Sequence, residues 1–554
     1  MRPDRCASVS DRYPAPRLLK SLVSRRSLAA AVLAPLLGNH DLIAAPSTQP
    51  ASTFTVATNR APSDFDPHSA YDAGSGMALS GPYEGLIRLQ PGTIDRYVGN
   101  LAEAWEANAD RSTWTFRIRP GVTFHDGSPL DAEAARASFE RVLTLGLAPS
   151  QVLGRFITDP ARITAPDTRT LVFDLGRPQP LFEAAMASAY GTAVVNAALL
   201  RRHDVGGDWG AGWAQQNVDG LGTGPYRIVG FDPVEGVRFE RFDDYWGGWD
   251  GPYFDRIVIR VVTEPETRLA LIEHGDADVA ATLPLSSIPS LERIPDLVVD
   301  RRYNLAVQYI AMNASGVLSP PAARQALCWA FPYDEVIEGI YRGYAKRAIG
   351  PVAELCRGFA PETFVYQTDL DQARTLLREA GVGEGTSLTI LLAAGVQDTV
   401  AIAEAFQANL AAVGIELSIQ QVDFATYVDI VLGDLLPEER PNLFPMFWQP
   451  DYNDGWNHLA PQVSCAAGSF GNAGQYCNPR VETLLATARD AADAETYRAA
   501  LAEIQQVVTR DDPAAIYVAQ AEWLTVLRRD VAGFVPNPVA SVLLDFRALR
   551  RAAG

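Results

Sequence analysis

The most informative stretch of the chain is residues 101–142, LAEAWEANADRSTWTFRIRPGVTFHDGSPLDAEAARASFERV. Inside it, Thr113–Arg119 (TWTFRIR) places apolar residues at every second position, the pattern of a strand with one buried face. Pro120-Gly121 marks a turn into a second short strand at residues 122–124, which predicts a β-hairpin. Apolar residues at helical spacing follow over residues 132–145. The stretch therefore predicts a hairpin followed by a helix.

Outward from this stretch, the chain alternates between strand and helix patterns. An early strand is predicted at residues 53–59. From about residue 310 onward, helices are predicted at 322–342, 369–380 and 400–413, and strands at 388–393 and 415–422. Towards the C-terminus, helices are predicted at 480–491 and 496–509, and returning strands at 515–518 and 524–527. Such alternation is typical of an α/β domain.

The length and charge of the chain exclude several classes of protein. At about 100–200 residues per domain, a chain of 554 residues makes about three or four folding units, so a single small module is excluded. The chain carries 66 Asp and Glu against 47 Lys and Arg, a formal net charge of -19. Because such a surface repels phosphate groups, we expect binding neither to nucleic acid nor to an anionic membrane surface.

The first 50 residues have the composition of an export signal. A cluster of basic residues precedes an apolar run, LAAAVLAPLL, at residues 28–37. As a helix this run reaches about 15 Å, half of the hydrocarbon core of a bilayer, so it is too short for a stable transmembrane anchor. The pair Arg25-Arg26 is similar to the twin-arginine signal, and the general secretory route stays open beside it. We therefore expect residues 1–50 to be an export signal and the mature protein to be periplasmic and soluble.

Four cysteines remain after the leader, and an even number in an exported protein favours disulfides. Pairing each cysteine with its nearest partner in the sequence predicts the bonds Cys328–Cys356 and Cys465–Cys477. The alternative is that the thiols are free and buried. None of the spacings forms a CxxC pair, which excludes a zinc site of that kind.

The sequence carries no motif of catalysis. The six histidines are scattered, without the i, i+4 spacing of a helical metal site. It has no GxxxxGK[ST] loop for phosphate, and neither GxSxG nor SxxK for a serine nucleophile. We therefore expect no metal, no cofactor and no enzymatic activity. A secreted hydrolase is the rival class, and it would need a positioned nucleophile and base.

Several further segments, in order along the chain, resemble one family. Beside residues 101–142 they are GTGPY at 222–226, DYWGG at 244–248, TRL at 267–269, GDADV at 275–279, RQAL at 324–327, YCNP at 476–479 and DVAGF at 530–534. Together they resemble the family 5 extracellular solute-binding proteins, the oligopeptide, dipeptide and nickel receptors of ABC importers. The resemblance runs from about residue 54 to the C-terminus.

The resemblance implies an α/β, two-lobed fold of the periplasmic-binding-protein-like type II kind, in its large three-domain variant. The implied division is 51–90, 221–305 and 520–554 for a discontinuous domain I, 91–220 for domain II and 306–519 for domain III. It also implies a monomer that captures a peptide or other amine-bearing small solute between closing lobes and delivers it to an ABC permease complex in the inner membrane. A binding module that acts as a sensor or chaperone stays an alternative.

Ligand-binding residues are expected in FWQPDYNDGW at residues 447–456, where carboxylates and large aromatic rings suit a buried amine beside stacking surfaces. On composition alone, the alternative is a solvated acidic turn with anchoring tryptophans. In the family's peptide receptors a carboxylate of this segment holds the ligand's α-amino group, and Asp451 stands at the matching place. The N-terminal loop of the same cleft matches Tyr71 and Ala73. The full set of candidates is Tyr71, Ala73, Gln397, Trp448, Asp451, Tyr452, Asp454 and Trp456.

The sequence departs from these peptide receptors where they hold the peptide's carboxylate. They place an Arg or His either shortly before the segment above or in the loop after the strand equivalent to 388–393. Here the two places read PMF at 445–447 and GVQD at 395–398, without a cation. A longer peptide, an amide-like ligand or another amine therefore stays open beside a short free peptide.

Overall fold

The computed structural model describes residues 52–552, except residues 216, 233–235, 395, 434, 467–471, 492 and 541–543. The expected export signal, residues 1–50, lies outside the described residues. None of the helices in the described part of the chain is long and apolar enough to cross a membrane.

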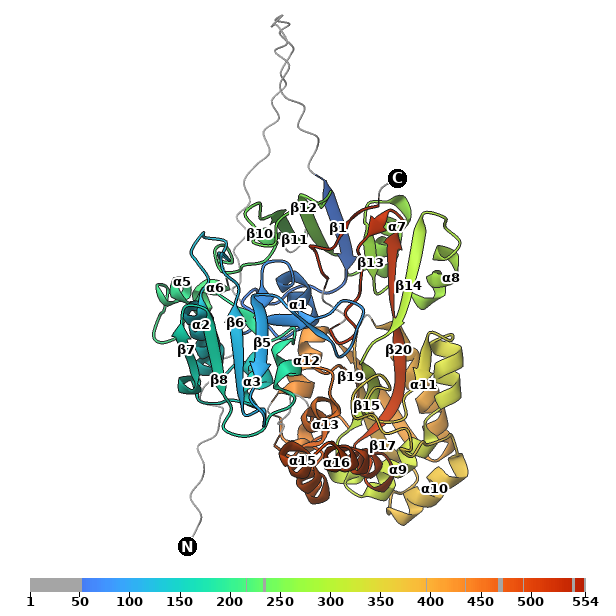
Figure 1. The fold of residues 1–554 in the computed structure, drawn as a ribbon. Coiled ribbons are helices and arrows are strands. Elements are labelled where there is room, and N and C mark those ends of the chain that lie inside the picture. The colour runs from blue at the N-terminus through green and yellow to red at the C-terminus, as the bar shows by residue number, and fades with distance from the viewer. Residues whose placement is uncertain are drawn as a thin grey trace, which may run out of the picture. The chain divides into compact units, whose positions relative to one another are not determined.

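One long strand joins the two lobes of the molecule. β20 (Ala515–Arg528) pairs through its first half with β15 (Val307–Met312) and through its second half with β14 (Leu297–Tyr303). Figure 1 shows β20 running the length of the structure from one lobe into the other. We call residues 307–519 the second lobe and the other described residues the first lobe. The two strands predicted at 515–518 and 524–527 are thus one continuous strand that crosses between lobes.

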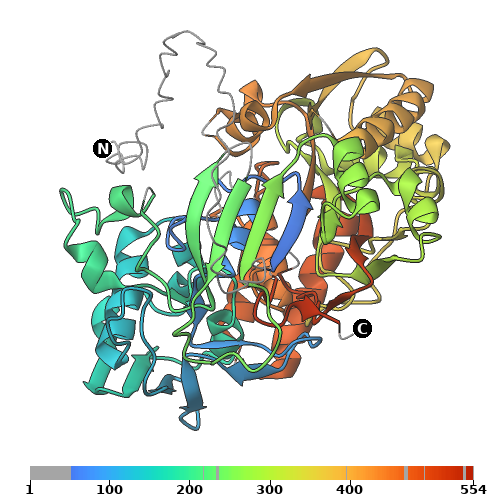
Figure 2. The ribbon, with the colours of Figure 1, turned by 90° about the horizontal axis from the view of Figure 1, so that it is seen from above.

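The first lobe is built on the outer half of a mixed sheet. Its strands are β10 (Tyr226–Asp232), β11 (Gly236–Arg241), β12 (Arg256–Val261), β1 (Thr53–Thr58) and β13 (Val279–Ala281), in that order. Figure 2 shows the first four of them side by side, β10 to β12 in green and β1 in blue. β1 pairs in parallel with β12 and β13, and β13 pairs with β20. α7 (Pro265–His274) packs against β1 and β13.

The stretch 101–142 forms a separate four-stranded sheet with a covering helix. The order is β5 (Ala102–Ala107), β6 (Thr113–Ile118), β8 (Thr170–Asp174) and β7 (Ile163–Asp167), and α2 (Ala132–Leu145) packs on β7 and β8. The predicted strand and helix are confirmed. The predicted hairpin is wrong, because β6 pairs with β5 and β8. Residues 122–124 fold back on 128–130 across a turn in which Gly127 takes a φ of 83°.

The second lobe confirms the predicted α/β alternation. Its strands continue the sheet beyond β20 in the order β15, β19 (Leu443–Trp448), β17 (Thr386–Ala393) and β18 (Ile415–Val422). Its longer helices are α9 (Pro321–Ala330), α10 (Leu370–Glu379), α11 (Gln397–Ala412), α12 (Phe424–Leu432), α13 (Gly455–Val463), α15 (Pro479–Asp490) and α16 (Ala494–Gln506). The helix predicted at 322–342 is shorter, since Pro332 cannot continue it and α9 ends at Ala330.

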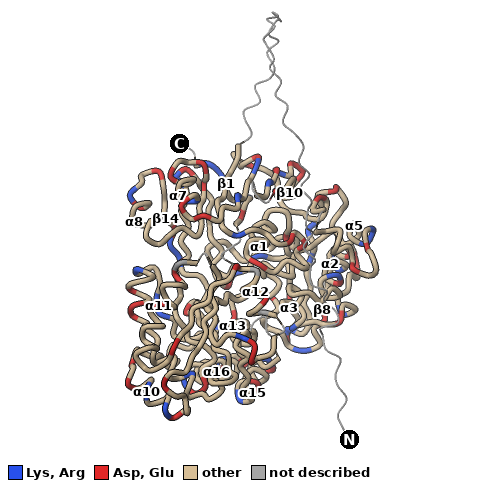
Figure 3. Tube along the Cα trace, turned by 180° about the vertical axis from the view of Figure 1, so that it is seen from behind, with Lys and Arg blue, Asp and Glu red and all other residues tan. Residues whose placement is uncertain are grey.

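The described residues form one compact unit, and the division into three domains stays a prediction. Figure 3 shows that acidic and basic residues are interspersed along the chain.

The cysteines follow the prediction in one pair and depart from it in the other. Cys465 and Cys477 form a disulfide, with Cα atoms 4.7 Å apart. Cys328 and Cys356 are free and buried, so the predicted bond between them is wrong. Cys328 lies in α9 within the helix-covered core of the second lobe, and Cys356 lies in a different apolar cluster. Closeness in the sequence did not bring their side chains together, and the alternative of buried thiols holds for this pair.

Candidate functional site

The segment 447–456 connects a strand end to a helix start. β19 ends at Trp448, and its neighbour β17 runs parallel to it. In open α/β sheets, ligands bind outside the carboxyl ends of parallel strands, which is where residues 449–454 lie. Asp454 then caps α13, accepting a hydrogen bond from the Trp456 amide at 2.9 Å. The predicted segment is therefore held at both ends by regular structure.

Asp451 is a partly buried carboxylate whose hydrogen-bond partners among the described residues are neutral. Its Oδ1 accepts a 2.7 Å hydrogen bond from the hydroxyl of Tyr71, and its Oδ2 accepts one of 3.3 Å from the Asn457 amide. Among the described residues, no Arg, Lys or His forms an ion pair with it. Burial raises the pKa of the Asp451 carboxyl, and the two hydrogen bonds lower it in part. The Asp451 carboxyl thus has no compensating cation in the part of the chain that the structure describes.

Tyr71 brings the first lobe to this carboxylate. It lies directly before α1 (Ala73–Leu79), which Asp72 caps by accepting from the Ser75 amide at 2.9 Å. The Tyr71 ring packs against Tyr190, with centroids 4.8 Å apart. Burial and the nearby Asp451 charge raise the pKa of Tyr71 well above its usual value, so it stays a hydrogen-bond donor. Ala73, the other predicted residue of this loop, is the first residue of α1.

Tyr452 makes the second contact between the lobes. Its hydroxyl accepts a 2.7 Å hydrogen bond from Nη1 of Arg155, which follows α3 (Gln151–Gly154) in the first lobe. The Arg155 guanidinium also lies 3.5 Å from the centre of the Trp456 ring, within the range of a cation–π contact. Sequence reasoning missed Arg155, because it stands outside every motif and reaches the segment only through the fold.

Asp454 and the two tryptophans hold the segment's own lobe together. Asp454 is fully buried, accepts a hydrogen bond from the hydroxyl of Tyr497, and has its Oδ2 without a partner among the described residues. Trp448 donates from Nε1 to the Asn457 carbonyl at 3.0 Å, and Trp456 donates to the Leu485 carbonyl at 3.3 Å. The two tryptophans therefore anchor the segment, which agrees with that part of the alternative interpretation of a turn with anchoring tryptophans. The side chain of Gln397 lies outside the described part of the chain.

The lobes meet closely around Asp451. The cavity that it lines with Tyr452 and Asn453 measures about 10 Å³, room for about one water. Asn453 donates to the Ile94 carbonyl of the first lobe at 3.0 Å. Three successive residues of the segment thus bond to the opposite lobe. Among the described residues, no cluster of His, Cys, Asp and Glu could hold a metal ion.

Two kinds of sequence comparison find relatives of this chain. The family model of the bacterial extracellular solute-binding proteins, family 5 (middle), matches residues 96–470. The probable D,D-dipeptide-binding periplasmic protein DdpA of Escherichia coli (strain K12) is 27% identical over 539 residues, covering 96% of this chain and 100% of the relative. Di/tripeptide-binding protein 4 of Pseudomonas aeruginosa (strain UCBPP-PA14) is 28% identical over 520 residues, covering 89% and 94%.

A solved structure has the same fold. The ABC transporter-associated periplasmic binding protein DppA from Helicobacter pylori, in complex with the peptide STSA, matches with a TM-score of 0.79 at 23% identity. The match covers 90% of this chain and 98% of that chain. The predicted two-lobed α/β fold is therefore confirmed.

Proposed function

This chain belongs to family 5 of the bacterial extracellular solute-binding proteins, and from that membership we propose that it captures a short peptide, or another small solute with a primary amine, through Asp451. It is a solute-binding protein of the kind that serves ABC importers. The peptide-binding relatives support a peptide as the ligand.

The observation that carries the proposal is the partly buried carboxylate of Asp451, which lies at the contact between the lobes and has no ion-pair partner among the described residues. Asp66, by contrast, pairs with Arg141, and both of these side chains are buried. A buried charge without a partner costs several kcal/mol, and a cationic ligand removes that cost by forming charge-assisted hydrogen bonds. An ammonium group at Asp451 would therefore gain more than the same group at an exposed carboxylate.

The contacts between the lobes suggest how capture proceeds. Tyr71 holds the Asp451 oxygen that an ammonium would need, and Arg155 holds Tyr452. Opening of the lobes breaks both contacts and exposes the carboxylate. When the lobes close on a ligand, they bury the ion pair between its ammonium group and Asp451. Water is then excluded, and the attraction between the two charges becomes stronger.

The proposal extends to the compartment, the oligomeric state and the partner of the protein. We infer that the chain is exported to the periplasm, acts as a monomer, hands its ligand to an ABC permease and catalyses no reaction. The periplasmic relatives support the compartment. No observation on the described residues favours a role as sensor, chaperone or hydrolase over delivery to a permease.

Native mass spectrometry of the protein purified from the periplasm tests the proposal. We expect a bound species of peptide mass that, once released, reacts with an amine-specific reagent. A released ligand without an amine would contradict the proposal.

A further inference from the structure

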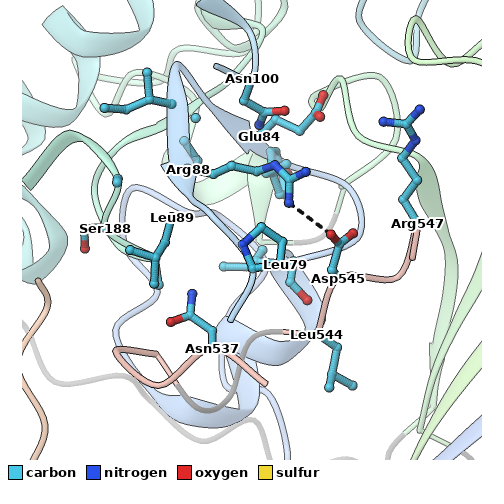
Figure 4. A pocket seen from close by; sticks show the side chains of 18 of the residues that line it. Leu79, Glu84, Arg88, Leu89, Asn100, Ser188, Asn537, Leu544, Asp545 and Arg547 are labelled. Atoms are coloured by element: carbon cyan, nitrogen blue, oxygen red, sulfur yellow. Dashed lines mark hydrogen bonds and ion pairs between the residues drawn. The ribbon is translucent and has the colours of Figure 1, made fainter. Parts of the chain in front are cut away.

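A larger pocket lies beside the site of Asp451, on the first lobe. It measures about 200 Å³, and its polar lining comes from β3 (Ile87–Leu89), the loop around Ser188, and the C-terminal segment. Figure 4 shows the side chains that line it, among them Arg88, Asn100, Ser188, Asn537, Asp545 and Arg547. Pockets for drug-sized ligands measure about 300–1,000 Å³, so this one has room for one end of a small ligand.

The pocket and the small cavity at Asp451 have walls in common. Four residues line both: Leu89, Ala187, Ala189 and Asn537. Leu89 lies next to Arg88 in β3, so the same strand borders the cavity of Asp451 and carries a cation into the pocket. A ligand whose amine sits at Asp451 can therefore extend along this wall towards Arg88.

Arg88 has hydrogen-bond donors without a partner among the described residues. Its Nη1 donates to Oδ2 of Asp545 at 3.0 Å, the contact drawn in Figure 4. Its Nε and Nη2 have no partner among the described residues. These two atoms form one side of the guanidinium fork, which matches the two oxygens of a carboxylate. The Arg88 side chain is 43% exposed, so a ligand can reach it.

Two other charged groups of the pocket, Glu84 and Arg547, are bonded elsewhere, so they leave the free donors of Arg88 open to a ligand. Glu84 is buried, and its carboxylate already accepts hydrogen bonds from Thr223 at 2.9 Å and from Tyr245 and Trp246 at 2.8 Å. Arg547 donates to the Gly247 carbonyl at 2.6 Å. Two carboxylates face two guanidinium groups, so the pocket carries no net charge that would repel an anion.

The amide of Asn100 supports a polar ligand in the same place. Asn100 lines the pocket, and its side-chain amide has no hydrogen-bond partner among the described residues, although its polar atoms reach solvent. A ligand carbonyl or carboxylate could therefore replace water at this amide. We propose that this pocket takes the carboxyl-terminal end of a short linear peptide and that Nε and Nη2 of Arg88 hold its free carboxylate.

This assignment rests on the proposed function, which places the peptide's amine at Asp451. It also supplies a cation that the sequence lacks at the two places where the family's peptide receptors hold the carboxylate. The expected ligand is therefore a short peptide with both termini free, instead of an amide or a segment of a longer chain.

The test uses three pools of randomised tripeptides: one with both termini free, one amidated at the C-terminus and one acetylated at the N-terminus. The mature protein is incubated with each pool and passed through a desalting column, and the retained peptides are quantified by mass spectrometry. We expect the free pool to be retained about tenfold or more above the amidated pool, from the loss of one charge-assisted bidentate contact. In Arg88→Gln this preference should disappear, while Arg88→Lys, which keeps the charge and loses the fork, should retain part of it.

Arg96→Gln is the matched control. Arg96 is exposed, lies in the loop that follows β3 and does not line the pocket, so its variant loses the same charge and should keep the wild-type preference. Circular dichroism of each variant shows whether it is folded. Equal retention of free and amidated pools by the wild type, or a preference that survives in folded Arg88→Gln, overturns the assignment.

The acetylated pool separates this inference from the proposed function. If acetylated peptides are retained as strongly as free peptides, the proposed role of Asp451 is overturned. The comparison of free with amidated peptides still tests whether Arg88 binds the carboxylate. Retention of none of the pools overturns both.

Discussion

The hydroxyl of Tyr71 donates a 2.7 Å hydrogen bond to Oδ1 of Asp451, and the two residues lie 380 positions apart in the chain. Tyr71 precedes α1 in the first lobe, and Asp451 follows β19 in the second. Their hydrogen bond therefore joins the two lobes directly. An amine that binds Asp451 would use the same carboxylate that accepts this hydrogen bond.

Asp451→Asn should weaken peptide binding by about 2 to 5 kcal/mol, the usual cost of removing one partner of a buried interfacial ion pair. Isothermal titration calorimetry with a peptide retained by the wild type measures the loss. Asp454→Asn is the control. Because Asp454 caps α13 and accepts from Tyr497, its variant should lose about 0.5 to 2 kcal/mol of folding stability and little affinity. Equal affinity losses in the two variants would contradict this division of roles.

Peptide binding should weaken as the pH falls. Burial raises the pKa of Asp451, and an ammonium ligand binds the ionised carboxylate. Binding therefore releases a proton, and below this raised pKa the dissociation constant should rise by up to about tenfold per pH unit. Calorimetry between pH 8 and pH 5 measures the slope. In Asp451→Asn the dissociation constant should depend less on pH. An unchanged pH dependence in that variant would show that another group titrates.

Arg155→Met should speed ligand release. The substitution removes the hydrogen bond to Tyr452 and the contact with the Trp456 ring, both of which hold the lobes together. A hydrogen bond to a charged group contributes about 1.5–3 kcal/mol, so the dissociation rate should rise about tenfold or more. Stopped-flow fluorescence follows this rate.

Arg177→Met provides the comparison for Arg155. Arg177 also bridges the lobes, pairing with Asp490 at 2.9 Å, but both side chains are about half exposed. Exposed pairs contribute about 0.2–1 kcal/mol, so this variant should release ligand nearly as slowly as the wild type. Equal dissociation rates in wild type and Arg155→Met would remove Arg155 from the closure of the lobes.

Thiol titration should find two reactive cysteines in the denatured, unreduced mature protein. These are Cys328 and Cys356, whereas Cys465 and Cys477 are bonded. Reduction should then lower the free energy of unfolding by about 3 kcal/mol, the chain-entropy value for a loop of this size. Four reactive thiols, or none, would contradict the pairing.

The sequence predicted those features that depend on neighbouring residues. The period of two in β6 and the helical spacing in α2 are local patterns, and both elements formed where they were expected. The partners of β6 were missed: β8 lies more than 50 positions further on, and β5 lies before β6, whereas the prediction placed the partner after it. The break after α9 follows from Pro332, a local signal whose weight was underestimated.

The candidate site was predictable in part for the same reason. The segment 447–456 stands out by composition and by resemblance, so Asp451 and Tyr452 were among the candidates. The roles of Arg155 and Arg88 depend on contacts with residues about 300 and 450 positions away, which no local pattern signals. The free state of Cys328 and Cys356 likewise depends on the two different cores that bury them.

A crystal structure of the mature protein with its natural ligand bound tests the central claim most directly. The quantity to measure is the distance between the ligand's ammonium nitrogen and the nearer carboxylate oxygen of Asp451. We predict a distance of about 2.7–2.9 Å, the range of a charge-assisted hydrogen bond. A ligand bound between the lobes with no cationic group in contact with Asp451 would contradict the account.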